Sequence, residues 1–281
     1  MKKWICFILS CCLIACFAGV SAAAETAAAT VRVTLSDQSG KVVLAQEPIT
    51  VTDRNEDGKL DIDEALFAAH EAKFEGGAAA GYATSTTEWG LGITKLLGDE
   101  SGSYGYYVNH KSAWNLSDEV KDGDLIDAFV YQDSKAWSDV YAYFDQDTAS
   151  ITEGDEITLV LKDSEYDAAA QSMAEVPVSG AVITINGEET AYKTDAEGKV
   201  TFPLNQVGEV LISAKSADKI LVPPVFKATV SAKPAPAPVT EEEPKPAETK
   251  SPKTGDHGTL IVLFALCAVA AVFAGKKWHE A

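Results

Sequence analysis

Cysteine is missing from most of this sequence. The five cysteines stand at positions 6, 11, 12, 16 and 267, inside two hydrophobic stretches at the ends, and residues 25–255 contain none. The body of the protein therefore has no disulfide framework and no thiolate metal site. A bound cation could take the place of a disulfide in stabilising this part of the protein.

Basic residues are also scarce. The 281 residues include 23 lysines and arginines against 42 aspartates and glutamates, which gives a formal net charge of −19. An acidic surface repels phosphate backbones, so we expect no nucleic-acid partner. The same excess of carboxylates favours solubility and the binding of cations.

Only four histidines are present, at positions 70, 110, 257 and 279. No Ser-His-Asp or Cys-His arrangement, glycine-rich phosphate loop or zinc-ligand spacing is apparent along the chain. We therefore expect a protein that is not an enzyme.

The N-terminal stretch predicts export. "MKK" precedes an apolar run and then a stretch of small residues that suits signal-peptidase cleavage. This order is typical of a secretory signal peptide over residues 1–24. "LIAC", ending at Cys16, is the alternative, because it resembles a lipobox and would make Cys16 a lipidated N-terminus.

The C-terminal stretch predicts an anchor. Residues 232–250 form a Pro-rich charged linker, and "SPKTG" at 251–255 precedes an apolar run over 259–275 and a basic cytoplasmic tail over 276–281. This order resembles the sorting signal of Gram-positive surface proteins, except that Ser251 stands where leucine is usual. The resemblance implies cleavage by a sortase between Thr254 and Gly255 and attachment to peptidoglycan in the cell wall. A plain transmembrane anchor is the alternative, and both place the body on the extracellular face.

"DRNEDGKLDIDE" at residues 53–64 matches the complete twelve-residue EF-hand loop pattern. Calcium takes six to eight oxygen ligands, and the last glutamate supplies two of them. The Lys59 ligand is its backbone carbonyl, and Gly58 stands at the sharp turn. The predicted Ca²⁺ ligands are Asp53, Asn55, Asp57, Lys59, Asp61 and Glu64.

A strand over 47–52 and a helix over 62–74, stopped at Gly76–Gly77, are expected to flank this loop. One helix instead of two resembles the half EF-hands of dockerin-like proteins, and it favours a structural role for the calcium. The competing interpretation is an acidic turn in which Asp61 caps the helix and Glu64 completes a capping box.

Residues 31–145 read as one α+β domain that is mainly β, with the calcium-loop helix on its sheet. "GYYVNHKSAW" followed by "VKDGDLIDAFVY" resembles the β-grasp-like C-terminal domain family of transcobalamin. The resemblance implies that Tyr106 to Asn109 form a strand and that Asp122 to Asp124 form a turn.

Residues 148–231 read as a second domain, a small antiparallel β-sandwich. "VSGAVITING", "TDAEGKVTF" and "GEVLISA" resemble the collagen-adhesin B-type and carboxypeptidase-regulatory-like domains. Members of the adhesin family often carry a Lys–Asn crosslink promoted by a buried acid, but Ala214 stands where that acid is expected. We therefore expect no crosslink, and a hairpin turn at 195–198.

Aromatic residues crowd into positions 89–143. Alternation along a strand sends only one face inward, so part of this set is expected to be exposed to a ligand. The predicted ligand residues are Tyr104, Tyr106, Tyr107 and Trp114. Two functions remain open: a calcium-binding, wall-anchored adhesion protein for a glycan or protein, and a surface receptor that scavenges a corrinoid or another tetrapyrrole.

Overall fold

The computed structural model describes residues 28–167 and 169–234. The first sheet has the strand order β2-β1-β7-β5-β6, in which β1 and β7 are parallel and the other neighbours are antiparallel. Its strands are β1 (Ala28–Ser36), β2 (Val42–Thr52), β5 (Tyr104–Val108), β6 (Lys111–Ser112) and β7 (Leu125–Val130).

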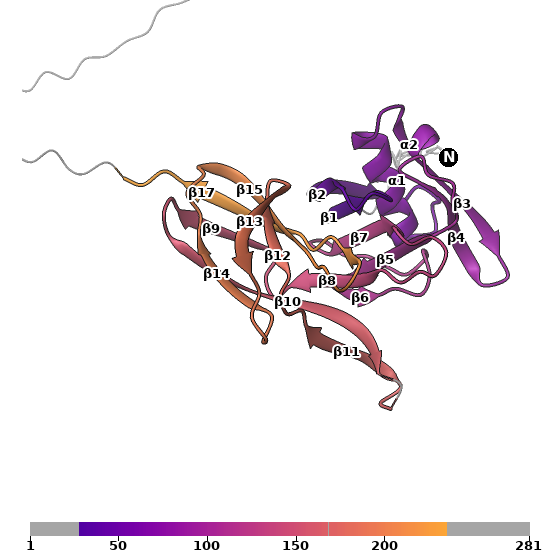
Figure 1. Cartoon of the computed structure of the whole chain (residues 1–281). Helices are drawn as coiled ribbons and strands as arrows, with labels where there is room; N and C mark the ends of the chain where they lie inside the picture. The colour runs from indigo at the N-terminus through magenta and orange to yellow at the C-terminus, as the bar shows by residue number, and fades with distance from the viewer. Residues whose placement is uncertain (1–27, 168, 235–281) are drawn as a thin grey trace, which may run out of the picture. The chain divides into compact units, whose positions relative to one another are not determined.

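One main helix, α1 (Ile62–Lys73), packs on this sheet (Figure 1). Ile62, Leu66 and Ala69 recur at helical spacing and are fully buried, against the alternate strand residues Val31 and Val33. The expected strand over 47–52 lies inside β2, and the expected helix is α1. A five-residue helix, α2 (Gly77–Gly81), and a hairpin of β3 (Tyr82–Thr87) and β4 (Gly90–Leu96) follow.

The remaining strands form two further sheets around a second core. One sheet has the order β11-β10-β8-β16 with β14 on β10, and the other has the order β13-β12-β15-β17-β9. The bounds are β8 (Val140–Phe144), β9 (Thr148–Thr152), β10 (Glu156–Asp167), β11 (Ser172–Pro177), β12 (Val182–Ile185), β13 (Glu188–Lys193), β14 (Lys199–Pro203), β15 (Gly208–Lys215), β16 (Leu221–Val222) and β17 (Phe226–Ser231).

The last strand, β17, lies between two neighbours. It pairs antiparallel with β15 and parallel with β9, with Lys227 opposite Thr148 and Ser231 opposite Thr152. The chain leaves this sheet at the C-terminal end of β17. Antiparallel pairing thus dominates the sheet, but its β9 edge is parallel.

Strand β8 links the two parts of the fold. It precedes the predicted domain boundary at 145–148, yet it pairs with β10 and β16, which follow that boundary. Ala142 and Phe144 point into the second core, whereas Tyr141 and Tyr143 form a small separate cluster with Phe129 and Val222. The alternation of β8 therefore places its two faces in two different apolar clusters.

The observed architecture is mostly β with several sheets and one main helix, as the sequence predicts in outline. Among residues 28–167 and 169–234, no helix is long and apolar enough to cross a membrane. The predicted signal peptide, sorting motif, transmembrane run and tail lie outside the described residues, as does the linker beyond residue 234.

Candidate functional site: an acidic loop and two exposed tryptophans

The acidic loop connects β2 to α1, and its first half is closed by its own side chains. The Asp53 carboxylate accepts hydrogen bonds from the backbone N–H groups of Asp57 (3.1 Å) and Gly58 (2.8 Å). Gly58 has a φ of +85°, which side-chain-bearing residues rarely adopt. The sharp turn expected at this glycine is therefore present.

Glu64 turns back from the helix into the loop. Its Oε1 accepts hydrogen bonds from the backbone N–H groups of Arg54 and Asn55, while its Oε2 is buried without a hydrogen-bond partner among the described residues. A buried carboxylate oxygen left unpaired is costly, and a water molecule or a cation bound at this atom would remove that cost. This atom, Glu64 Oε2, is the second oxygen that the predicted bidentate calcium ligand would supply.

Asp61 caps α1. Its Oδ1 accepts a hydrogen bond from the Glu64 N–H at 2.9 Å, as the helix-start interpretation requires. The reciprocal half of a capping box, from Glu64 to the Asp61 N–H, does not form, because Glu64 Oε1 is held by the start of the loop. The helix cap alone therefore does not explain where Glu64 points.

Carboxylates crowd each other at the end of the loop. The pKa of Asp61 is raised to about 6. Burial is the largest cause, the hydrogen bond from the Glu64 N–H opposes the shift, and the negative charges of Glu64, Asp63 and Asp57 add to it. The Asp63 carboxylate has its own partners: the Tyr82 hydroxyl donates to it at 2.9 Å, and the Arg54 guanidinium lies 3.3 Å away. A divalent cation would relieve this repulsion.

The donors fit calcium by chemical type and by order, but in this conformation they do not converge. Within residues 28–167 and 169–234, no group of three His, Cys, Asp or Glu side chains is placed to hold a metal ion. Asn55 Nδ2 donates to Asp57 (3.1 Å), and Asp57 accepts from the Lys59 N–H (2.9 Å), so loop groups satisfy each other. A calcium ion would have to replace some of these internal hydrogen bonds.

A segment that the sequence did not single out fixes the end of the loop. Val120 N–H donates to the Leu60 carbonyl at 2.8 Å, Ile62 N–H donates to the Asp118 carbonyl at 3.2 Å, and the Lys59 ammonium lies 2.7 Å from Glu119. Residues 116–120 therefore hold the end of the acidic loop in place. In a paired EF-hand, a second helix–loop unit would have this role. No periodic signal in the sequence marks this segment.

His70 on α1 faces Tyr82 and Leu97 at the two ends of the β3–β4 hairpin and is fully buried. Its Nδ1 lies 2.7 Å from the Leu66 carbonyl, its Nε2 accepts from the Leu97 N–H at 3.2 Å, and its ring stacks on Tyr82. Burial lowers the pKa of His70, although the Leu66 carbonyl opposes the shift. The neutral imidazole thus satisfies one donor and one acceptor inside the core.

This arrangement predicts a dependence of stability on pH. Because the folded protein keeps His70 neutral, its contribution is complete above the unfolded pKa of 6.5 and is lost as the pH falls below that value. Melting temperatures measured from pH 7.5 to about pH 5 should therefore fall on the acid side. His70→Gln is expected to lower the melting temperature overall and to flatten this slope, and an unchanged slope in the variant would assign the effect to other groups.

The three predicted ligand tyrosines are half-buried and already engaged. The Tyr104 hydroxyl donates to the Asp99 carbonyl at 2.7 Å, Tyr106 packs against the first core, and the Tyr107 ring stacks on Tyr141 with the centroids 3.6 Å apart. Trp114, by contrast, is 93% exposed. The structure does not bring these four side chains together as one exposed strip.

The predicted strand and turn of the GYYVN and DGD motifs meet through Asn109. Its Nδ2 donates to Asp124 at 2.8 Å, and its Oδ1 accepts from the Leu125 N–H at 2.9 Å. Asn109 and His110 both have positive φ, as the two central residues of a tight hairpin between β5 and β6 require. This turn carries His110 to the end of the first sheet.

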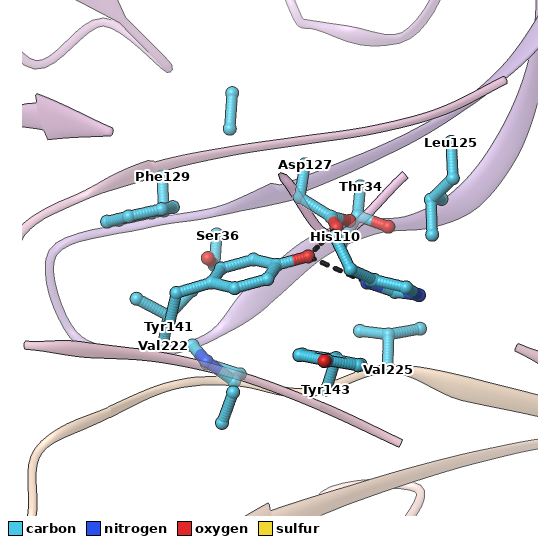
Figure 2. A pocket seen from close by; sticks show the side chains of 13 residues that line it. Thr34, Ser36, His110, Leu125, Asp127, Phe129, Tyr141, Tyr143, Val222 and Val225 are labelled. Atoms are coloured by element: carbon cyan, nitrogen blue, oxygen red, sulfur yellow. Dashed lines mark hydrogen bonds between the residues drawn. The ribbon is translucent and has the colours of Figure 1, made fainter. Parts of the chain in front are cut away.

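His110 belongs to a polar cluster that the sequence did not predict. Its Nδ1 lies 3.0 Å from the Tyr141 hydroxyl, which donates to Asp127 (Figure 2). Its Nε2 lies 2.9 Å from Asp147. Burial raises the pKa of Asp127, and the hydrogen bond from His110 lowers the pKa of Asp147, which also pairs with Arg32 at 3.0 Å.

The space beside this cluster is nearly filled. Its cavity measures about 10 Å³, which is room for about one water molecule. Thr34, Ser36, Phe129 and Val222 are among the other residues that line it (Figure 2). The cluster therefore ties β5–β6 to β8 and to the segment before β9, and it leaves no space for a larger ligand.

Among residues 28–167 and 169–234, two tryptophans on adjoining loops are the most exposed large apolar side chains. Trp89 is 85% exposed at the β3–β4 turn, and Trp114 is 93% exposed after β6. The residues that follow them, Gly90 and Asn115, touch: a Cβ on Gly90 would lie 2.3 Å from the Asn115 amide nitrogen. This contact brings the two loops together, and it is a long-range feature that no spacing in the sequence reveals.

Comparisons with known proteins do not assign this chain to a family. Neither the models of known protein families nor the curated proteins gave a match. Among solved structures, the N-terminal four Ig domains of Dscam1 isoform 7.44 match over 73% of this chain and 46% of that one, with 8% identity and a TM-score of 0.21. The N-terminal eight Ig domains of Down Syndrome Cell Adhesion Molecule isoform 1.30.30 match over 46% of this chain and 20% of that one, with 10% identity and a TM-score of 0.20. This chain thus spans less than half the length of either structure, and the TM-scores are too low to carry an argument.

Proposed function

We propose that this protein is a calcium-stabilised surface protein that presents a carbohydrate-binding site, and that Trp89 and Trp114 form the contact surface. The exposed pair of tryptophans on touching loops carries the proposal. Leaving two indole rings in water is unfavourable unless a partner covers them, and aromatic faces stack well on the apolar faces of sugar rings.

The surroundings of the pair suit a neutral, hydroxyl-rich polymer. Glu88 precedes Trp89, and the Asp118 carboxylate accepts hydrogen bonds from the backbone N–H groups of Trp114 and Asn115, both at 3.2 Å. Amide and carboxylate groups beside an aromatic face are the usual complement of sugar hydroxyls. The net charge of −19 disfavours an anionic membrane as the partner.

The acidic loop supplies the calcium part of the proposal. Its closed first half and the unpaired Glu64 Oε2 support a structural ion that fixes the junction of β2, α1 and residues 116–120. Trp114 lies two residues before that segment, so the same ion would steady one of the two tryptophan loops. We further propose the β-grasp-like fold for the first sheet and its helix, and a β-sandwich for the two later sheets.

Export and anchoring complete the proposal. The signal peptide, the sortase substrate SPKTG and the membrane run are predictions from the sequence alone, and they would display the described domains outside a Gram-positive cell. We favour a polymer ligand over a corrinoid because both tryptophans project from loops, whereas a corrinoid ring is best held in an enclosed pocket.

Substitution of the two tryptophans tests the binding surface. In a pull-down of the full chain with insoluble glycans, including purified peptidoglycan, Trp89→Ala and Trp114→Ala should each weaken retention several-fold, since stacking of one ring is worth about 1 kcal/mol. Met173→Ala is the matched control, because Met173 is an exposed apolar side chain on β11.

Retention on a glycan that survives the double variant unchanged would refute this surface. Visible-absorbance titration with cobalamin and haem separates the alternative receptor, because only a tetrapyrrole site would shift those spectra. A saturable shift that the double variant preserves would favour scavenging over adhesion.

A further inference from the structure

A second site lies in a groove far along the sequence from the tryptophans. It has a volume of about 580 Å³ and is formed by the β1–β2 turn, β12, β15 and the residues before β16. Ligand pockets of small molecules have volumes of about 300–1,000 Å³. The groove is therefore of the right size for a mono- or disaccharide.

The floor of the groove is the outer face of the β12–β15 pair. Along β15, Val210, Ile212 and Ala214 point into the second core, so Leu211 and Ser213 point the other way and line the groove. Thr184 on β12 is paired with Ser213 and lines the groove beside it. The floor thus combines one apolar side chain with two hydroxyls.

The walls are held in place by one glutamine. Gln132 Nε2 donates to the Leu221 carbonyl at 2.8 Å, and the Gln132 side chain lies against Gly40, where an added Cβ would stand 2.6 Å from its Oε1. Gly40 has a φ of +75°, so glycine is favoured at this turn. Gln132 therefore fixes the β1–β2 turn and the segment before β16 as the two walls of the groove.

The charge of the groove is opposite to that of the protein. The described residues that line it include Lys41, Lys215 and Lys219 and no aspartate or glutamate, in a chain of net charge −19. Lys215 pairs with Glu189 at 3.1 Å, and Lys219 pairs with Asp163 at 2.6 Å. Among the described residues, the Lys41 ammonium has no direct ion-pair partner, although the Asp37 carboxylate of the same turn lies near enough to interact with its charge.

Thr184 presents a hydroxyl group to the groove. Its side chain faces away from the core, yet the residue is only 4% exposed, and no described residue hydrogen-bonds its hydroxyl. Because this hydroxyl is itself reached by solvent and not enclosed, it is open to the groove and can bond a ligand there. Ser213 presents a second hydroxyl on the same floor.

We propose that this groove binds an acidic sugar. The carboxylate or phosphate of the sugar lies at Lys41, its hydroxyls bond Thr184 and Ser213, and one apolar face of its ring covers Leu211. A charged group at one end and hydroxyls along the floor match such a ligand better than an apolar molecule or a cation. This site is independent of the tryptophan surface.

Isothermal titration of the full chain at low ionic strength tests the proposal with three probes: glucuronate, glucose 6-phosphate and glucose. Binding of glucuronate, of glucose 6-phosphate or of both, with glucose at least about tenfold weaker, is the expected result, because a hydrogen bond to a charged group is worth more than about 1.4 kcal/mol. Which acid binds identifies the anionic group as carboxylate or phosphate.

Two variants locate the binding. Lys41→Gln should weaken it about tenfold, and Thr184→Val, which keeps the side-chain shape, should weaken it about threefold or more. Lys193→Gln, at an exposed lysine on β13 outside the groove, is the control and should change nothing. Absence of binding of both acids, equal binding of glucose, or equal effects of Lys41→Gln and Lys193→Gln would each overturn the proposal.

Discussion

Addition of calcium is expected to raise the melting temperature of the full chain by several degrees. Extracellular calcium modules bind at about 0.1–1 mM, so about 2 mM calcium stabilises the folded state by roughly 0.7–1.8 kcal/mol. The physical reason lies at the end of the acidic loop, where Asp61 has a pKa raised to about 6 by burial and by neighbouring carboxylates, and where Glu64 Oε2 has no partner among the described residues. A cation removes both penalties together.

Glu64→Ala should abolish the calcium-dependent shift, since it removes the bidentate ligand. Thermal melts with calcium, with magnesium and with EDTA measure the effect, and magnesium should substitute poorly because it demands octahedral geometry at shorter distances. Glu71→Ala, on the same helix but outside the loop, is the matched control and should keep the shift. Identical melts of the parent chain in calcium and in EDTA would leave the loop as an acidic helix start.

Replacement of Phe144 by alanine is expected to have the largest effect on stability. Phe144 is 1% exposed, and its ring meets Phe226 edge to face with the centroids 6.5 Å apart. Removal of a buried phenylalanine costs about 3–5 kcal/mol, through lost burial and the cavity that remains. Chemical denaturation of the full chain should show this loss as a lower midpoint with little change in slope.

An exposed position in the second part of the fold provides the comparison. Ser150, an exposed residue on β9, can be changed to alanine with a change expected within about 0.5 kcal/mol. Phe144→Leu, which keeps most of the apolar volume, should lose clearly less than Phe144→Ala. A loss below about 1 kcal/mol for Phe144→Ala would mean that β8 does not anchor the second core.

Local features of the sequence predicted the local structure well. The alternation of residues 47–52 corresponds to β2, and the helical spacing of Leu66, Phe67 and His70 corresponds to α1, because one face of each element must be buried. The Asp53 and Gly58 geometry also follows from short-range chain constraints. At the end of α1, the helix stops at Lys73, close to Gly76 with its φ of +84°.

Features that depend on distant contacts could not be predicted. The Trp89 and Trp114 loops meet where Gly90 lies against Asn115, and the Lys41 groove is formed by β12, β15 and the β1–β2 turn. The half-burial of Tyr107 likewise follows from its stacking on Tyr141, which lies on β8 in another sheet. Composition and spacing carry no record of such pairings.

The placement of β17 determines how this protein responds to tension. The chain leaves at the C-terminal end of β17, while the segment from the first sheet enters at the N-terminal end of the parallel strand β9, where Thr148 lies opposite Lys227. A pull between the first sheet and the exit from Ser231 therefore acts along these strands in opposite directions. Such a load shears the backbone ladder, so its hydrogen bonds resist together and do not open one at a time, and β15 adds a second ladder on the other side. This strand arrangement has the geometry of a mechanical clamp.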